Sequence, residues 1–180
     1  LKVFKEKIMG DQVGKAVSGA LCYVPKHEFD RVLSANISEI EKVELFVALC
    51  RINTLYMIAR SGSGHIGSSF SSLEIMAWMH LVHLRQEGLE SEGASNDIFF
   101  SSKGHDAPGL YNVMIGTGKL AFSLIHELRR LGGLPGHPDV GTPNIVTNTG
   151  SLGMGISKAK GMIIANRLLQ KLSLIHISEP

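Results

Sequence analysis

Three histidines in the same local setting are the residues of this sequence best suited to chemistry. His65, His105 and His137 each follow a glycine directly, in glycine-rich segments that we expect to be loops. Histidine is the side chain whose ordinary pKa lies closest to neutrality, so it can carry protons at physiological pH. A single Gly-His pair would usually be structural. Three of them, in loops of the kind that carry binding and catalysis, predict proton transfer beside a ligand.

A glycine-rich segment, Thr149–Gly155, precedes an apolar run over residues 156–169. Its three glycines allow the backbone to turn tightly and to approach a ligand closely. A helix that begins here would present unpaired backbone N–H groups and a partial positive charge at its start, and both favour phosphate binding. The segment therefore predicts a phosphate cradle, with a simple glycine-rich turn between core elements as the alternative.

Two other patterns are weaker. Gly62, Gly64 and Gly67 match the spacing of a dinucleotide-binding loop. That loop requires a preceding strand, however, and the sequence predicts a long helix there. His80 and His83 lie about one helical turn apart, but no acidic, Cys or His side chain follows at ligand spacing, so we interpret His80 as a core residue and His83 as a flanking one.

The composition is that of a globular domain with little net charge. The 180 residues are 44% hydrophobic and 19% charged, and their formal net charge is +2. No long basic run indicates nucleic acid, and no apolar run reaches the roughly 18 residues of a membrane span. The two cysteines are isolated and no signal-peptide pattern is visible, so we expect a cytoplasmic protein.

Capping signals and apolar periodicity predict two helices in the first half of the chain. Ser38 and Glu41 have capping-box spacing at the start of a helix expected over residues 38–60. This helix has apolar side chains on most of its faces, so we expect it to be buried. Ser71 and Glu74 repeat the spacing before the second helix.

The second half is predicted to add one short strand and further helices. Residues 97–101 read as a buried strand, and a helix is expected to start near Asp106. Further helices are expected over residues 120–131 and 156–169, separated by a proline- and glycine-rich loop over residues 135–143. Together these elements predict a helix-rich part of an α/β layer.

Four motifs resemble those of the amino-terminal, thiamine diphosphate-binding domain of the transketolase family. Residues 63–67 are similar to its first histidine motif, residues 102–111 to its second and residues 135–139 to its third. Residues 149–155 resemble its cofactor loop. The four motifs occur in the family's order and approximate spacing, which makes the set far more specific than any one of them.

The resemblance implies the fold and the cofactor contacts. The implied fold is an α/β open parallel sheet with helices on its faces, here helix-rich and partial. The implied assembly is a homodimer, or a pair with a complementary pyrimidine-binding subunit or domain. Contacts with the diphosphate and thiazolium end of the cofactor are implied for His105, Gly150, Ser151, Leu152 and Gly153.

The resemblance also implies the reaction. His65 and His137 would face a sugar phosphate substrate and would form the catalytic set together with His105. The implied reaction transfers a two-carbon glycolaldehyde unit from a ketose phosphate to an aldose phosphate, with thiamine diphosphate stabilising the carbanion. Three alternatives stay open: a related deoxyxylulose-phosphate type of synthase, a non-catalytic binding or regulatory module, and a three-histidine metalloenzyme.

Some features depart from the family's pattern. Ile66 stands where the family has proline, and Met154 where it usually has glutamine. The Gly-Asp-Gly motif and later asparagine that hold Mg²⁺ or another divalent cation are absent from this sequence. We therefore expect an incomplete portion of the enzyme, inactive alone. Its expected segments are a weakly patterned lead (1–37), the incomplete domain (38–169) and an atypical tail (170–180).

Overall fold

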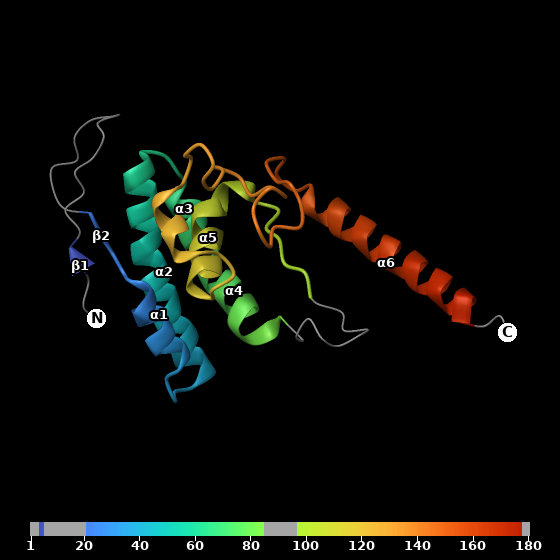
Figure 1. Cartoon of the computed structure of the whole chain (residues 1–180), viewed down its shortest axis with the longest axis horizontal. Helices are drawn as coiled ribbons and strands as arrows, with labels where there is room; N and C mark the ends of the chain where they lie inside the picture. Colours follow the sequence, from blue (N-terminus) through green and yellow to red (C-terminus); the bar gives the residue numbers. More distant parts are fainter. Residues whose placement is uncertain (1–3, 6–20, 85–96, 178–180) are drawn as a thin grey trace.

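The computed structural model describes residues 4–5, 21–84 and 97–177, and most of this part is helical (Figure 1). The α-helices are α1 (Lys26–Leu33), α2 (Glu39–Ser61), α3 (Ile66–Phe70), α4 (Leu73–Trp78), α5 (Ala107–Gly116) and α6 (Gly155–Ile177). Shorter helical turns are the π-helical η1 (Met79–His83) and the 3-10 turns η2 (Gly104–Asp106) and η3 (Phe122–His126). Within the described residues, no helix has the length and apolar character to span a membrane.

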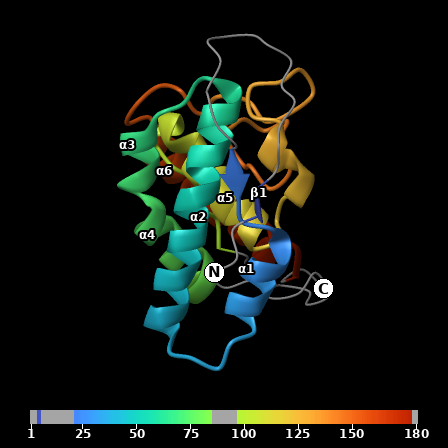
Figure 2. The same ribbon diagram turned by 90° about the vertical axis from the view of Figure 1, so that its left-hand side faces the viewer.

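Helix α2 is the central element, and α1, α4 and α5 pack against it (Figure 2). Its predicted capping box is confirmed, because the Ser38 hydroxyl accepts the Glu41 N–H at 3.3 Å while the Glu41 carboxylate accepts the Ser38 N–H at 3.1 Å. The helix ends at Gly62, whose φ of 67° is left-handed. Its burial is less complete than predicted, since Ile40 and Leu45 are exposed.

Removing the cap of α2 is expected to destabilise the chain. Ser38→Ala deletes the acceptor for the Glu41 N–H, and such a loss costs about 1 kcal/mol of the free energy of unfolding. Urea unfolding measures the change. Ser123→Ala is the control, because Ser123 is exposed and its side chain has no recorded hydrogen bond within the described residues. Equal losses in the two variants would contradict the prediction.

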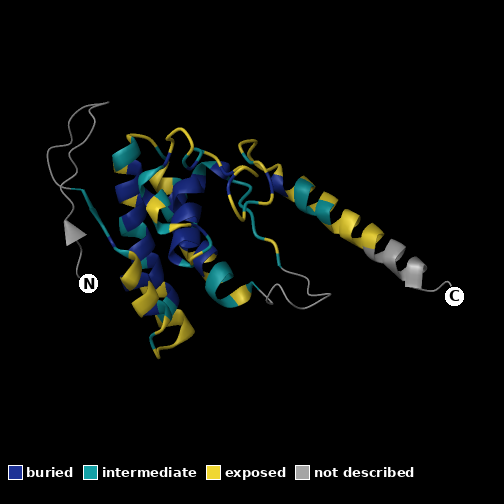
Figure 3. Cartoon of the chain, viewed as in Figure 1, coloured by how far each residue is buried: buried dark blue, intermediate teal, exposed yellow. Residues whose placement is uncertain are grey.

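The core lies between α1, α2, α4 and α5. Phe29 of α1 and Phe46 of α2 meet edge to face, with ring centroids 5.4 Å apart, and neither is exposed. Helix α5 is buried along its whole length, as the dark blue ribbon in Figure 3 shows. Its start at Asp106, with a proline in the first turn, is as predicted. The lead over residues 1–37 thus contributes α1 to the core.

The predicted strand over residues 97–101 does not form. These residues run as irregular chain, and Ile98 is half exposed. The sheet present in the described part has two strands, β1 (Phe4–Lys5) and β2 (Cys22–Tyr23), paired antiparallel with Phe4 opposite Tyr23. A strand needs a neighbour to bond its backbone groups, and residues 97–101 have none within the described part. The parallel sheet implied by the resemblance is therefore not seen there.

Two helix predictions are also wrong in detail. The second capping box does not form: α4 begins after Ser72, while Ser71 ends α3 and donates its hydroxyl to the Ser68 carbonyl. The helix expected over residues 120–131 is reduced to the turn η3. Beyond η3 the chain folds back, because Arg129 adopts a left-handed φ of 57° and donates its N–H to the Leu134 carbonyl.

Helix α6 begins where the sequence predicts a helix and leaves the body of the molecule (Figures 1 and 3). It continues to Ile177, beyond the expected end near residue 169. Almost every side chain described in it is half-buried or exposed, including five large apolar ones: Ile156, Ile163, Ile164, Leu168 and Leu169. Packing therefore holds α6 mainly at its first turn.

Candidate cofactor site

Two of the three predicted histidines lie against each other. His65 is the residue before α3, and His105 lies in η2, which leads into α5. Their rings are edge to face, with centroids 5.2 Å apart. His65 is exposed and His105 is half-buried, so a ligand could reach both. The first and second histidine motifs are thus brought together by folding.

A close approach of α3 to α5 holds this pair in place. A Cβ atom built on Gly109 of α5 would lie 3.2 Å from the Ser69 side chain of α3. Ser69 is fully buried, and its hydroxyl donates to the Asp106 carbonyl at 3.5 Å. The absence of a side chain at Gly109 thus lets the two helices approach without a crowded contact.

His137 is not part of the ring contact, and its side chain is exposed on the loop before the glycine-rich segment. The motif around it is nevertheless anchored on both sides. The Pro138 carbonyl accepts the Thr149 N–H at 3.0 Å and the Thr149 hydroxyl at 2.9 Å. The Pro135 carbonyl accepts the Tyr111 hydroxyl of α5 at 3.0 Å. The third histidine motif therefore adjoins the glycine-rich loop.

The second histidine motif supports the same loop from the other side. Ser102 accepts the Gly153 N–H on its carbonyl at 3.4 Å and the Gly155 N–H on its hydroxyl at 2.9 Å. A Cβ atom on Gly104 would lie 2.7 Å from the Thr149 Cβ atom and 3.0 Å from the Gly150 backbone nitrogen. Segments distant in sequence thus fix the start of α6.

This support leaves three consecutive backbone donors free. The N–H groups of Gly150, Ser151 and Leu152 have no recorded acceptor within the described residues, and all three residues are exposed. Gly150 and Gly153 have left-handed φ values of 124° and 85°, and open space lies where their side chains would be. Free N–H groups on a glycine turn at a helix start suit an anion such as a diphosphate, so the loop fits the group that the resemblance implies.

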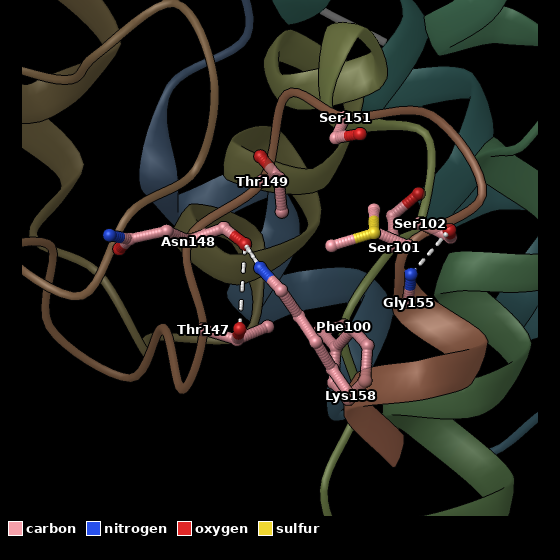
Figure 4. Close-up of a pocket in the computed structure, with 10 residues that line it drawn as sticks. Phe100, Ser101, Ser102, Thr147, Asn148, Thr149, Ser151, Gly155 and Lys158 are labelled. Atoms are coloured by element: carbon pink, nitrogen blue, oxygen red, sulfur yellow. Dashed lines mark hydrogen bonds between the residues drawn. The ribbon is translucent and has the colours of Figure 1, made fainter. Parts of the chain in front are cut away.

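A small, shallow hollow, open to solvent, lies between this loop and residues 100–102 (Figure 4). Its lining residues are Phe100, Ser101, Ser102, Thr147, Asn148, Thr149, Ser151, Met154, Gly155 and Lys158. The Lys158 ammonium group donates to the Asn148 carbonyl on one side of the hollow. Met154, which stands where the family usually has glutamine, gives the hollow an apolar wall.

Besides Lys158, the charged residues Lys103 and Asp106 lie at the site. The Lys103 ammonium group donates to the Ser71 hydroxyl at 3.3 Å. The Asp106 side chain is 1% exposed, and burial raises the pKa of its carboxyl, although the Ser101 hydroxyl and the positive charge of Lys103 oppose the rise. From the sequence, Asp106 is expected only to mark a helix start, because the partners of its side chain are not adjacent in sequence.

The histidine on η1 lies apart from these groups. His80 Nδ1 is 2.7 Å from the Lys119 ammonium nitrogen, and the His80 ring packs edge to face on Phe99. Burial, aided by the Lys119 charge, lowers the pKa of His80 to about 4, so the ring is neutral and accepts from Lys119. His83 is exposed, as predicted for a flanking residue, whereas His80, which was predicted to be a core residue, is only half-buried.

The described residues contain no group of three or more His, Cys, Asp or Glu side chains that could hold a metal ion. The three-histidine metalloenzyme is therefore not supported, because all three histidines lie in the described part and do not form such a group. Ligands for the divalent cation that the resemblance implies are likewise not seen among these residues.

Comparison with known proteins extends the resemblance to most of the chain. The family model for the transketolase thiamine diphosphate binding domain matches residues 43–173. Transketolase of Mus musculus is 36% identical over 124 residues, which are 68% of this chain and 20% of that protein. Transketolase-like protein 2 of Homo sapiens is 33% identical over 124 residues, with the same coverage.

A bacterial relative gives a similar result. Transketolase 2 of Xanthobacter flavus is 36% identical over 118 residues, which are 62% of this chain and 17% of that protein. The chain thus spans about a fifth of the length of the curated relatives it matches. With its glycine-rich loop held between two histidine motifs, and with the family model covering well over half of its residues, the chain belongs to the transketolase family through the domain that binds thiamine diphosphate.

Proposed function

We propose that this chain is the cofactor-binding part of an enzyme that transfers a two-carbon glycolaldehyde group between a ketose phosphate and an aldose phosphate with thiamine diphosphate. The observation that carries the proposal is the loop over residues 149–155. Thr149 is tied to the third histidine motif and Gly155 to the second, while residues 150–152 are exposed and their N–H groups have no acceptor within the described part of the chain. The named relatives support the reaction class.

In this proposal the chain holds the diphosphate with backbone donors and one histidine. The N–H groups of Gly150, Ser151 and Leu152 donate to phosphate oxygens, and Gly153 permits the turn with its left-handed φ. His105 donates from its ring at the same end of the site. Thiamine diphosphate, when bound, supplies the carbanion-stabilising centre that the side chains of a protein lack.

The other two histidines act on the substrate. His65 is exposed and touches His105, so it lies beside the place proposed for the diphosphate. His137 is exposed on the loop tied to Thr149. Each ring can hold a sugar hydroxyl group and exchange a proton with it.

The remaining parts of the site are proposed to lie outside these 180 residues. They are the ligands of Mg²⁺ or another divalent cation, the pyrimidine-binding subunit or homodimer partner, and the strands that complete an open parallel sheet. A diphosphate without its cation is poorly neutralised, so the chain alone is expected to show no measurable ketol transfer. The proposed setting is the cytoplasm.

A titration of the ¹⁵N-labelled chain tests the cofactor proposal even when binding is weak. Thiamine diphosphate with Mg²⁺ is expected to shift the amide signals of residues 150–152 because those N–H groups meet the phosphate oxygens. Inorganic pyrophosphate is expected to shift the same signals, and thiamine without phosphate is expected to leave them in place. His105→Ala is expected to weaken the response to thiamine diphosphate about tenfold, the equivalent of one charge-assisted hydrogen bond.

Three outcomes would count against the proposal. If thiamine diphosphate does not shift the amide signals of residues 150–152, the proposal that this loop binds the cofactor is wrong. If pyrophosphate does not shift the signals that thiamine diphosphate shifts, the proposal that the loop binds the diphosphate group is wrong. Measurable ketol transfer by the isolated chain, assayed with a ketose phosphate donor and an aldose phosphate acceptor, would show that no further part is needed.

A further inference from the structure

Asp106 carries a buried carboxyl group that the proposed chemistry does not use. It precedes α5, yet its side chain makes no capping bond to that helix. The side chain is 1% exposed, and one of its oxygens, Oδ1, has no hydrogen-bond partner among the described residues. Burying a carboxyl group is costly unless it is hydrogen-bonded or paired, so the bonds that Asp106 does make matter to the local structure.

The bonds of Asp106 close the turn that carries His105. Oδ2 of Asp106 accepts the Ser101 hydroxyl at 2.7 Å, and the Ser101 oxygen accepts the Lys103 N–H at 3.2 Å. The Asp106 N–H donates to the Lys103 carbonyl at 2.9 Å. Ser101 and Asp106 are therefore bonded to each other, and each is also bonded to the backbone of Lys103. His105 lies inside the turn that these bonds close.

Ser101 is the principal donor to this carboxylate. The Ser72 hydroxyl lies 3.5 Å from Oδ2, but it is only 2.8 Å from the Ser68 carbonyl. A hydroxyl group has one proton, so Ser72 donates to Ser68 in preference to Asp106. The hold of Asp106 on the turn thus depends chiefly on Ser101, which makes the link testable by single substitutions.

We propose that Asp106 is a positioning residue for His105. Its carboxyl group closes the turn through Ser101 and thereby holds the His105 ring against His65, beside the free N–H groups of the glycine-rich loop. The proposal rests on the proposed function only for the identity of the ligand, thiamine diphosphate. The effect of Asp106 on the contact between the two rings is independent of any ligand.

Two substitutions at Asp106 separate positioning from space filling. Asp106→Asn keeps an acceptor for the Ser101 hydroxyl, whereas Asp106→Ala removes it. In the ligand-free chain, the nuclear Overhauser effect between the His65 and His105 rings is expected to persist in D106N and to disappear in D106A. Thiamine diphosphate, followed at the amide signals of residues 150–152, is expected to bind D106A about tenfold more weakly and D106N within about threefold of the unsubstituted chain.

Further variants serve as matched controls. Ser101→Ala removes the same bond from its other end and is expected to behave like D106A. Asp30→Ala removes an exposed carboxylate that pairs with Lys26 on α1, and it is expected to change neither the ring contact nor binding. Urea unfolding of each variant shows how much stability is lost, so that an unfolded variant is not mistaken for a repositioned one.

The outcomes are distinguishable. Loss of the ring contact in folded D106A and S101A, with its rescue in D106N, supports the positioning role. A folded D106A that keeps both the ring contact and its affinity overturns the role, as does a D106N that behaves like D106A. If the unsubstituted chain does not respond to thiamine diphosphate, the proposed function fails, while the ring contact still decides the role of Asp106. Should D106A not fold, the comparison of S101A with D106N decides it.

Discussion

Replacing Gly104 with alanine is expected to weaken the binding of thiamine diphosphate. The new Cβ atom would lie 2.7 Å from the Thr149 Cβ atom, closer than real Cβ atoms come, and 3.0 Å from the Gly150 nitrogen, which is a very tight contact. The second contact is with backbone, so the loop itself must move. Overpacking of this kind typically costs about 1–3 kcal/mol of folding stability, and we expect the displaced loop to bind about tenfold more weakly.

Amide signals of residues 150–152, followed during a thiamine diphosphate titration, measure this effect. Gly161→Ala is the matched control, because a Cβ atom there meets nothing within 4 Å and the position lies within α6. This control is expected to bind as the unsubstituted chain does. A G104A variant with unchanged affinity would show that the contact between the second histidine motif and the loop does not shape the site.

Replacing Phe46 with alanine is expected to cause the largest loss of stability. Phe46 is fully buried in α2, its ring packs edge to face on Phe29, and its tip fills the space beside Gly116 of α5. The substitution therefore removes a contact shared by three helices. Phe→Ala changes at such sites cost about 3–5 kcal/mol, which is a large share of the roughly 5–15 kcal/mol that holds a typical domain together.

Urea unfolding monitored by circular dichroism measures this loss. The control is Ile75→Ala on α4, whose side chain is 65% exposed. We expect it to change the free energy of unfolding by less than about 1 kcal/mol, as surface substitutions usually do. Equal losses from F46A and I75A would mean that the packing of α1, α2 and α5 is not what stabilises the fold.

Features with a local cause could be predicted from the sequence. The start of α2 depends on Ser38 and Glu41, which are three residues apart, so the sequence contains the whole interaction. The end of α2 depends on one glycine, and the start of α5 is marked by the proline two residues after Asp106. Each of these boundaries was predicted because its partners lie within one helical turn.

Features that depend on distant partners were missed. Residues 97–101 have the composition of a strand, but without a neighbouring strand in the described part they form none. The apolar stripe over residues 120–131 fits a helix, yet the chain turns back at Arg129 and leaves Leu131 wholly exposed. Propensity and periodicity are weak signals, and tertiary contacts override them.

The same distinction applies to the site. The sequence, through its resemblance to the family, named His65, His105 and the glycine-rich loop, and the structure places the two rings in contact. The fit of Gly104 against Thr149 and the bond between Ser101 and Asp106 could not be predicted, since neither a motif nor a period encodes them. The roles of the individual residues stay predictions.

The projection of α6 has a consequence for how binding and helix stability are coupled. Because α6 buries little of its surface, its hydrogen bonds are protected mainly by its own helical propensity, and they can open without unfolding the core. Its first turn is the exception, since Gly155 is bonded to Ser102 beside the free donors of the loop. An anion bound to those N–H groups would oppose fraying of α6 from its first turn. Amide hydrogen exchange along α6 is therefore expected to slow when the loop is occupied.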